Sequence, residues 1–352
     1  MTSVTVKTGK PYEVRIGAGL LKEAPAMLSA LLPAKRLMVV SDDNVYPLYG
    51  ENLVESLSAA GFQTYSYVMK SGEQSKNLTV YGDLLQKLCE AGLTRDDSVI
   101  AMGGGVVGDL AGFAAATYQR GISYVQMPTS LLAAVDSSVG GKTAVDLPGG
   151  KNQVGAFCQP ALVICDIDTL KTLPEEEYRN GCAEIIKYGM LLGEPLFSRL
   201  SEQPVKEMYE EIIGCCVAVK RDYVEADEFD RGLRMLLNLG HTAGHGVELL
   251  SGFTVPHGQG VAIGMAIIAR AALAMGFCDE TVPERLVKLI KAYGLPTETA
   301  FTADEVSAAV SNDKKNTATS MRIVYPEAVG SCKVLSVSKE TFHEWLKAGG
   351  LA

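Results

Sequence analysis

Short β-rich runs alternate with helical patterns through the first half of this chain. Runs rich in Val, Ile and Tyr recur at 12–16, 36–40, 64–68, 98–102, 123–127 and 161–165. Helical patterns such as 49–60 and 78–91 lie between some of them. Strands separated by helices of this length are typical of a mostly parallel sheet. The alternation therefore predicts an α/β domain.

The pattern changes near residue 172. Leu173 and Pro174 precede three glutamates, which is typical of a helix start. Long helical patterns follow at 178–192, 205–224, 235–250, 261–275 and 283–292, and β-like runs at 321–325 and 333–337 predict a late hairpin. A length of 352 residues suits two domains. We expect an α/β domain at 1–172 and a mainly α-helical domain at 173–352, with the boundary between 168 and 180.

Composition narrows the class of partner. The net charge of −9 disfavours nucleic acid and anionic membranes, while a small anionic substrate is still possible at a local cationic cluster. The eight cysteines form no C-x-x-C pair and the N-terminus lacks a secretory apolar segment, so we expect a cytoplasmic protein with reduced thiols. The apolar stretch 261–277 contains Arg270 and predicts a core helix rather than a membrane span.

A glycine-rich turn follows the run at 98–102. Gly103, Gly105 and Gly108 match G-x-G-x-x-G between a predicted strand and a predicted helix. Such glycines let the backbone approach a pyrophosphate at a helix N-terminus. The acidic residue normally found about 20 positions later is missing, since Arg120 occupies that region. A nucleotide-binding turn and a tight turn for close helix packing both stay open.

Two other strand ends carry polar residues. Asp42 and Asn44 follow the run at 36–40, and the segment 71–76 follows the run at 64–68. Carboxylates at strand ends suit ribose hydroxyls. A solvated turn is the alternative for either segment alone.

A polar segment after residue 128 contains two Gly-Gly-Lys units, which end at Lys142 and Lys151. Paired glycines permit close backbone approach, and lysine supplies a point charge for a phosphate or carboxylate. A phosphate-binding P-loop is excluded, because Asp136 stands where that motif requires glycine. Surface lysines are the alternative.

Three of the four histidines lie within 17 residues, at His241, His245 and His257. Catalytic zinc usually takes three protein ligands and keeps one position open. Glu184, on an otherwise apolar predicted helix with Lys187, is a candidate carboxylate ligand. The alternatives are ordinary core or surface histidines and a buried Glu–Lys ion pair.

Further basic residues point to an anionic substrate. Lys220, Arg234, Arg120 and the pair Lys314–Lys315 add to the two loop lysines in an otherwise acidic chain. If these side chains converge, they form a cationic pocket suited to a phosphorylated, carboxylated substrate.

Together these motifs resemble the 3-dehydroquinate synthase family, within the sugar-phosphate cyclases, over residues 42–315. The matching segments are 72–76, 103–109, 136–143, 151–152, 184–187, 238–245 and 256–258. The resemblance implies an NAD-binding α/β domain, a helical metal domain holding Zn²⁺ or Co²⁺, an active site in the cleft, and a homodimer. Where the family has two threonines this chain has Thr129-Ser130, which keeps the hydroxyl.

The resemblance also implies residue roles. The metal ligands would be Glu184, His241 and His257, with His245 handling protons rather than binding the ion. The NAD set would be Asp42, Asn44, Glu73, Lys76, Gly104, Gly105, Val106, Asp109, Thr129, Ser130, Asp136, Lys142, Lys151, Thr169 and Thr172. The substrate and catalytic set would be Arg120, Lys142, Asn152, Lys187, Lys220, Arg234, Asn238, His245 and one of Lys314 or Lys315.

The implied reaction converts 3-deoxy-D-arabino-heptulosonate 7-phosphate to 3-dehydroquinate and phosphate in the shikimate pathway. It proceeds by transient NAD-mediated oxidation, phosphate elimination, re-reduction, ring opening and aldol closure. Three alternatives stay open: another sugar-phosphate cyclase, a metal-dependent polyol dehydrogenase, and a catalytically silent NAD-binding protein. Asn152, Lys220, Arg234, Asn238 and His245 favour the dehydroquinate reaction, and the complete ligand set disfavours the silent protein.

Overall fold

The computed structural model describes residues 1–311 and 320–352 and contains two compact units. Unit 1 comprises Met1–Leu173 and Lys220–Phe229, and unit 2 comprises Pro174–Val219 and Asp230–Ala352. The division expected from the sequence differs at two places, since Leu173 and the segment 220–229 were expected in the second domain but belong to unit 1. Helix α7 (Tyr209–Ala226) explains the difference at 220–229, because its last residues belong to unit 1 and its earlier ones to unit 2.

Unit 1 contains a seven-stranded sheet with the order β1-β2-β9-β6-β5-β3-β4. Its strands are β1 (Thr2–Val6), β2 (Tyr12–Gly17), β3 (Arg36–Asp42), β4 (Gln63–Met69), β5 (Ser98–Gly103), β6 (Ser123–Pro128) and β9 (Leu162–Asp166). All six predicted strands are present, and the β1–β2 pair alone is antiparallel within this sheet. The predicted mostly parallel α/β architecture is confirmed.

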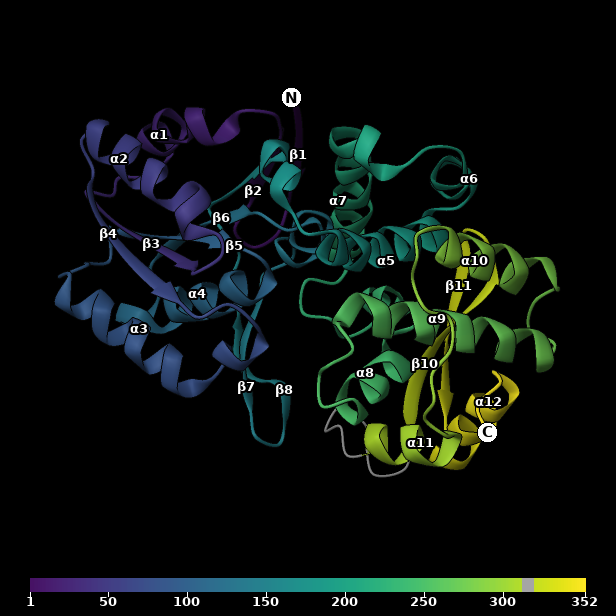
Figure 1. Cartoon of the computed structure of the whole chain (residues 1–352). Helices are drawn as coiled ribbons and strands as arrows, with labels where there is room; N and C mark the ends of the chain where they lie inside the picture. Colours follow the sequence, from purple (N-terminus) through teal and green to yellow (C-terminus); the bar gives the residue numbers. More distant parts are fainter. Residues whose placement is uncertain (312–319) are drawn as a thin grey trace. The chain divides into compact units, whose positions relative to one another are not determined.

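Helices cover both faces of this sheet (Figure 1). They are α1 (Leu20–Leu31), α2 (Glu51–Ala59), α3 (Leu78–Glu90) and α4 (Gly105–Thr117). Leu37 and Val39 of β3 pack with α1 and α2, whereas Met38 and Val40 pack with α3 and α4. Successive side chains of a strand point to opposite faces, so a strand covered on both sides is apolar throughout.

The strand order reverses between β3 and β5. The chain passes from β3 to its outer neighbour β4, then returns to β5 on the other side of β3 and continues to β6. In open α/β sheets, ligands bind outside the carboxyl ends of the strands at such a reversal. The carboxyl ends of β3, β4, β5 and β6 form what we name the strand-end edge.

The polar segment after residue 141 forms a hairpin, which the sequence did not predict. Strands β7 (Lys142–Leu147) and β8 (Gly150–Phe157) pair antiparallel. Val145 is buried against the α3–α4 side of the sheet, and the backbone N–H of Asp146 donates to the carbonyl of Lys76. The Gly-Gly-Lys units therefore lie on an ordered hairpin within unit 1.

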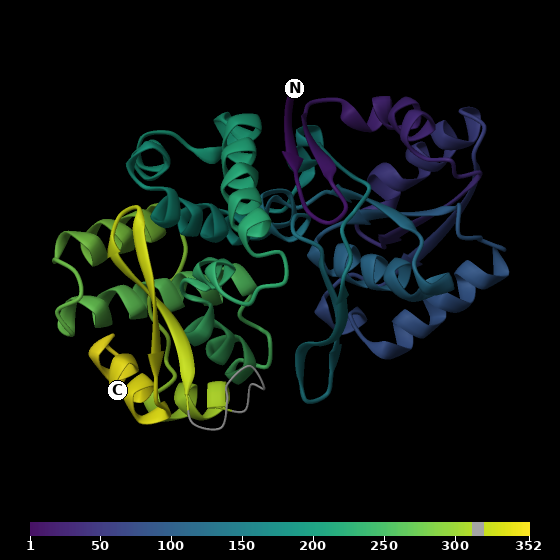
Figure 2. The ribbon, with the colours of Figure 1, turned by 180° about the vertical axis from the view of Figure 1, so that it is seen from behind.

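Unit 2 is mainly helical, as predicted. Its helices are α5 (Glu175–Leu192), α6 (Glu194–Glu202), the first part of α7, α8 (His241–Leu250), α9 (His257–Ala274), α10 (Thr281–Ala292), α11 (Ala303–Ser311) and α12 (Lys339–Ala348). The predicted late hairpin is also present, as β10 (Met321–Ala328) and β11 (Ser331–Val337), and lies against α9 and α5 (Figure 2). Helix α9 is long and apolar enough to cross a membrane, but 72% of it is buried inside the unit, as expected of a core helix.

The predicted helix 235–250 is wrong at its beginning. A 3₁₀ turn covers Leu233–Asn238, and α8 begins only at His241. Gly240 separates them with φ 79°, a left-handed conformation that glycine adopts without steric cost. A side chain at Gly240 would also lie 2.6 Å from the carbonyl oxygen of Val261 on α9. The break places His241 on the first turn of α8.

Candidate metal centre and nucleotide-binding edge

Three predicted ligands converge in unit 2 to form what we name the metal cluster: Glu184, His241 and His257. Glu184 lies in the middle of α5, while His241 and His257 are the first residues of α8 and α9. The Nε2 atoms of His241 and His257 lie 3.4 and 3.3 Å from the same atom, Glu184 Oε1. Zinc bonds of 2.0–2.1 Å at tetrahedral angles separate ligand atoms by about 3.3 Å. The spacing therefore suits a single tetrahedral ion.

Glycines bring α8 and α9 together at this cluster. A Cβ on Gly244 would lie 2.6 Å from the carbonyl oxygen of Gly260, and one on Gly264 would overlap the carbonyl oxygen of Gly240. The two helices thus contact each other backbone to backbone. The pairs Gly240/Gly244 and Gly260/Gly264 each have three residues between them, a spacing that could have predicted this contact.

Electrostatics at the cluster are tightly coupled. Glu184 and Lys187 are both about 1% exposed, and Glu184 Oε2 lies 2.5 Å from Lys187 Nζ. Burial and nearby Lys187 hold the pKa of His241 well below its usual value, which keeps this imidazole neutral. Burial lowers the pKa of His257, but Glu248 and Glu184 outweigh it and raise that pKa to about 10.

His245 belongs to the same histidine group. Its ring centroid lies 5.5 Å from that of His241 and 5.7 Å from that of His257. His245 does not belong to the group of possible metal ligands formed by Glu184, His241 and His257. Its ligand atom instead lies within 4.8 Å of those of Glu248 and His257, which form a second such group. Sequence reasoning missed Glu248; an acid three residues after His245 in an apolar helix was the available signal.

Other unit 2 candidates lie on the turn that leads into α8. Arg234 is buried and Asn238 is half-buried, both within the 3₁₀ turn before Gly240. Lys314 and Lys315 fall outside the described residues.

Lys76 connects several candidates at the strand-end edge. Its Nζ lies 2.5 Å from Asp109 Oδ2 and donates to Asn152 Oδ1 at 2.6 Å. Lys76 is 4% exposed; burial lowers its pKa, but Asp109 and Glu73 outweigh burial and raise it. Lys151 Nζ lies 3.4 Å from Glu73 Oε1. These charges tie the β7–β8 hairpin to the loop after β4.

Two hairpin candidates, Lys142 and Asn152, are exposed. Lys142 is the first residue of β7, and Asn152 has a left-handed φ of 53°. The Lys76 hydrogen bond and a bond from the Asn152 backbone N–H to Asp146 Oδ1 at 2.7 Å hold this conformation. Left-handed residues other than glycine are uncommon and cluster at functional sites.

The glycine-rich turn lies at the β5–α4 junction, as predicted. A Cβ on Gly108 would lie 2.8 Å from Gln126 Oε1 on β6, so close packing accounts for this glycine. Gly104 is the N-cap residue of α4, and no side chain caps the helix there. The first turn of α4 contains Gly105 and Val106. Free N–H groups and the helix dipole there suit a phosphate. Thr129 adjoins the turn, because its N–H donates to the carbonyl of Gly103 at 3.0 Å.

Several remaining candidates at this edge already have protein partners. Asp42 Oδ1 accepts from the N–H groups of Asn44 and Val45, both at 2.9 Å, and burial raises the pKa of Asp42. Asp136 forms an ion pair with Lys220 of α7, within unit 1. These groups brace the loops in which they lie.

Smaller polar candidates lie on neighbouring turns. Thr169 is buried, and its hydroxyl donates to the carbonyl of Asp166 at the end of β9. Thr172 shares a 2.5 Å hydroxyl hydrogen bond with Tyr49. Ser130 Oγ accepts from the N–H of Ala133 at 3.3 Å.

Arg120 lies away from the strand-end edge. It follows the C-terminal end of α4, whose 13 residues span about 20 Å. Arg120 is exposed with a φ of 66° and precedes the start of β6, at the opposite edge of the sheet. Unit 1 therefore does not bring Arg120 beside Asn152, which is bonded to Lys76 at the strand-end edge.

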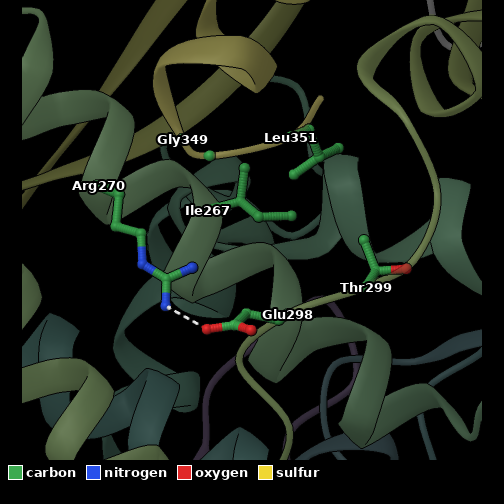
Figure 3. A pocket seen from close by; sticks show the side chains of 7 residues that line it. Ile267, Arg270, Glu298, Thr299, Gly349 and Leu351 are labelled. Atoms are coloured by element: carbon green, nitrogen blue, oxygen red, sulfur yellow. Dashed lines mark ion pairs between the residues drawn. The ribbon is translucent and has the colours of Figure 1, made fainter.

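A separate cavity of about 390 Å³ lies near the C-terminal part of α9 (Figure 3). Its lining is Ile267, Arg270, Glu298, Thr299 and residues 349–351. Arg270 donates to the carbonyl of Thr297 at 3.0 Å and lies 3.8 Å from Glu298. The cavity contains none of the predicted site residues.

Comparisons with known proteins identify the family. Residues 66–180 match the family model 3-dehydroquinate synthase N-terminal, and residues 181–316 match 3-dehydroquinate synthase C-terminal. The 3-dehydroquinate synthase of Pelotomaculum thermopropionicum is 42% identical, covering 99% of this chain and 97% of that protein.

Two solved structures share the fold. One is 2-deoxy-scyllo-inosose synthase complexed with carbaglucose-6-phosphate, NAD⁺ and Co²⁺, at TM-score 0.88 and 23% identity, covering 98% of this chain and 99% of that one. The other is 2-epi-5-epi-valiolone synthase from Streptomyces hygroscopicus subsp. jinggangensis with NAD⁺ and Zn²⁺ bound, at TM-score 0.86 and 26% identity, covering 99% and 98%. From the two family models and the full-length relative, the chain belongs to the 3-dehydroquinate synthase family.

Proposed function

We propose that this chain converts 3-deoxy-D-arabino-heptulosonate 7-phosphate to 3-dehydroquinate and inorganic phosphate, as a carbon–oxygen lyase of the shikimate pathway. Its full-length relative carries this enzyme name. The observation that carries the proposal is the convergence of two imidazole Nε2 atoms on one oxygen of Glu184. The spacing suits a metal ion, and two proteins of the same fold were crystallised with NAD⁺ and Co²⁺ or Zn²⁺.

The metal cluster fits Zn²⁺ or Co²⁺, because two imidazoles and one carboxylate are the donors these ions take in catalytic sites. When bound, the ion would act as a Lewis acid toward substrate oxygens. Lys187 holds the second oxygen of Glu184, which leaves Oε1 facing the two imidazoles. His245 lies within reach of the same space and is the proposed proton acceptor rather than a fourth ligand.

NAD would carry a hydride away and return it, so the reaction produces no net NADH. The first turn of α4, with Gly104, Gly105 and Val106, would hold the pyrophosphate. The remaining proposed NAD residues are Asp42, Asn44, Glu73, Lys76, Asp109, Thr129, Ser130, Asp136, Lys142, Lys151, Thr169 and Thr172.

The substrate carries a carboxylate and a phosphate, so it needs cations and amide donors. The proposed residues are Lys142, Asn152, Lys187, Lys220, Arg234, Asn238 and one of Lys314 or Lys315, together with Arg120, which within unit 1 lies at the edge opposite Asn152. Asn152 in its left-handed conformation exposes the side-chain amide, while its carbonyl oxygen is held by Lys76. Because the carbonyl oxygen accepts from Lys76, we propose that the amide N–H₂ donates to substrate.

Incubation of the purified protein with this substrate, catalytic NAD⁺ and Zn²⁺ or Co²⁺ tests the proposal. We expect phosphate release without accumulating NADH, and loss of activity with a chelator. Steady NADH formation would indicate a polyol dehydrogenase instead. Turnover of sedoheptulose 7-phosphate in place of the heptulosonate would indicate another sugar-phosphate cyclase.

The homodimer and the cytoplasmic location expected from the sequence stay predictions. Light scattering of the purified chain tests the first, and cell fractionation tests the second.

A further inference from the structure

His257 is held between two buried carboxylates. Its Nε2 lies 3.3 Å from Glu184 Oε1, and its Nδ1 lies 2.9 Å from Glu248 Oε1. Glu248 is 1% exposed, so its carboxylate lies inside unit 2 on α8. The two ring nitrogens of His257 thus face different partners.

This arrangement determines which nitrogen of His257 can bind a metal. A neutral imidazole carries a proton on one nitrogen and a lone pair on the other. A carboxylate at Nδ1 accepts a hydrogen bond that keeps the proton on Nδ1, so the neutral ring has its lone pair on Nε2, which faces Glu184. We infer that Glu248 is a positioning residue that sets the tautomer and ring orientation of the metal ligand His257. The inference rests on the metal site of the proposed function.

The packing around Glu248 supports this role. A Cβ on Gly260 of α9 would lie 2.9 Å from Glu248 Cγ and 3.2 Å from its Oε1. Glycine at position 260 therefore leaves the space through which the carboxylate reaches His257. The carbonyl of Glu248 accepts from Ser251 Oγ at 2.8 Å and from the N–H of Phe253 at 2.9 Å, which anchors this end of α8.

A rival interpretation is a second cation site formed by His245, Glu248 and His257, whose donor atoms lie within 4.8 Å of one another. Such a site would need the lone pair of His257 on Nδ1. The metal cluster needs that lone pair on Nε2, and a neutral ring supplies only one. The positioning role is compatible with the metal cluster, whereas the second site competes with it.

Co²⁺ affinity of the apo-protein tests the inference without reference to turnover. Removing a carboxylate that orients a histidine ligand typically weakens metal binding about 10–100-fold. We expect this loss for Glu248→Ala and a smaller loss for Glu248→Gln, whose amide oxygen still accepts from Nδ1–H. Ser251→Ala is the matched control: it removes two local hydrogen bonds at the same helix end, to the Glu248 carbonyl and from the Val255 N–H, and should leave the affinity unchanged.

A second readout follows the His257 ring directly. The chain has four histidines, so ¹⁵N-histidine spectra of the Zn²⁺-loaded protein can be assigned with single variants. We expect a slowly exchanging Nδ1–H resonance of His257 in the wild type, in Glu248→Gln and in Ser251→Ala. In Glu248→Ala this resonance should be lost to exchange with water.

The inference would be overturned if Glu248→Ala bound Co²⁺ with wild-type affinity, or if the Nδ1–H resonance of His257 were unchanged in that variant. Two Co²⁺ per wild-type chain, with one lost in Glu248→Ala, would also overturn it in favour of the second cation site. Circular dichroism shows whether Glu248→Ala folds. If it does not fold, Glu248→Gln replaces it: full Co²⁺ affinity together with an unshifted His257 Nδ1–H resonance in Glu248→Gln would overturn the inference. Absence of Co²⁺ binding in the wild type is a distinct result, because it would overturn the proposed metal site itself.

Discussion

The metal cluster of unit 2 and the strand-end edge of unit 1 hold their polar residues in different ways. In the metal cluster, two imidazole nitrogens lie within 3.5 Å of one Glu184 oxygen, and further buried charges contact these side chains. At the strand-end edge, many candidates are exposed or already bonded to nearby backbone, and Gly104 and Gly105 have no polar side chain at all.

The difference follows from the ligands each region suits. A metal ion needs a few donor atoms at fixed separations, so each side chain is essential. A dinucleotide is bound largely by backbone N–H groups and strand ends, so contributions are spread over many residues. We therefore expect single substitutions to have larger effects on function in the metal cluster than at the strand-end edge.

The largest effect should come from Glu184→Gln. This change keeps the side-chain volume but removes the charge shared by two imidazoles and Lys187. One of the three proposed protein ligands to a divalent ion is lost, so we expect metal affinity to fall about 100-fold or more, with activity falling in parallel. Competition with a chelator measures the affinity.

Glu194→Gln is the control for that variant, because Glu194 is an exposed carboxylate of unit 2 paired with Arg285. It should leave metal affinity unchanged. Equal metal binding by Glu184→Gln and Glu194→Gln would show that Glu184 is not a ligand.

Most single substitutions at the strand-end edge should have small effects, but Lys76→Met should destabilise the protein strongly. It leaves Asp109 without its buried partner and releases Asn152, which should cost about 3–5 kcal/mol in the free energy of unfolding. Lys70→Met is the matched control: its ion pair with Asp43 is 3.1 Å long, but the Lys70 side chain is 89% exposed. Urea unfolding should show a large change for the first variant and none for the second; similar midpoints would contradict a buried role for Lys76.

A smaller effect is expected from Gly264→Ala. The added methyl would overlap the carbonyl oxygen of Gly240, so α8 and α9 must separate, at a cost of about 3 kcal/mol. The separation should also weaken Co²⁺ binding, because His241 and His257 begin these two helices. Gly82→Ala of α3 is the control, since its Cβ would meet open space and should stabilise the protein by about 0.5–1 kcal/mol. Unaltered Co²⁺ affinity in Gly264→Ala would show that metal binding does not depend on the close contact between α8 and α9.

The smallest effect concerns Asp97, which lies before β5 in unit 1. Burial raises its pKa, but hydrogen bonds from the N–H groups of Thr94, Arg36 and Lys35 outweigh burial and lower it. A lowered folded pKa gives stability that is present above the unfolded value near 4 and is lost as pH falls through the folded value. Asp97→Asn should cost about 1 kcal/mol at pH 7, and less below pH 4. Denaturant unfolding at pH 7 and below pH 4 checks this; a cost independent of pH would contradict it.

Much of the fold could be predicted because the β-rich runs and helical patterns repeat clearly. All six predicted strands of the parallel sheet and the late hairpin are present. The β7–β8 hairpin was missed because its glycines and lysines are typical of loops. The start of α8 was misplaced because leucines at 236, 237 and 239 continue a helical pattern that Gly240 interrupts.

More of the residue positions in the metal cluster than at the strand-end edge could be predicted from the sequence. Crowded histidines in a histidine-poor chain are a strong local signal. Glu184, more than 50 residues away, was a candidate as an acid on an apolar predicted helix, and the family resemblance made it a ligand. Glu248 and the glycines between α8 and α9 were missed, because their roles depend on how two helices pack. Arg120 shows the opposite case: position along the chain does not reveal that α4 carries it to the other edge of the sheet.

Metal binding by His241→Ala and His245→Ala tests the central claim most directly. The two histidines lie one helical turn apart with rings 5.5 Å from each other, yet only His241 faces Glu184 in the proposed ligand set. Co²⁺ titration of the apo-proteins should show that His241→Ala loses the tight site, while His245→Ala keeps one ion per chain and loses turnover rate. Equal loss of Co²⁺ in both variants, or tight binding retained in His241→Ala, would contradict the assignment of Glu184, His241 and His257 as the ligands.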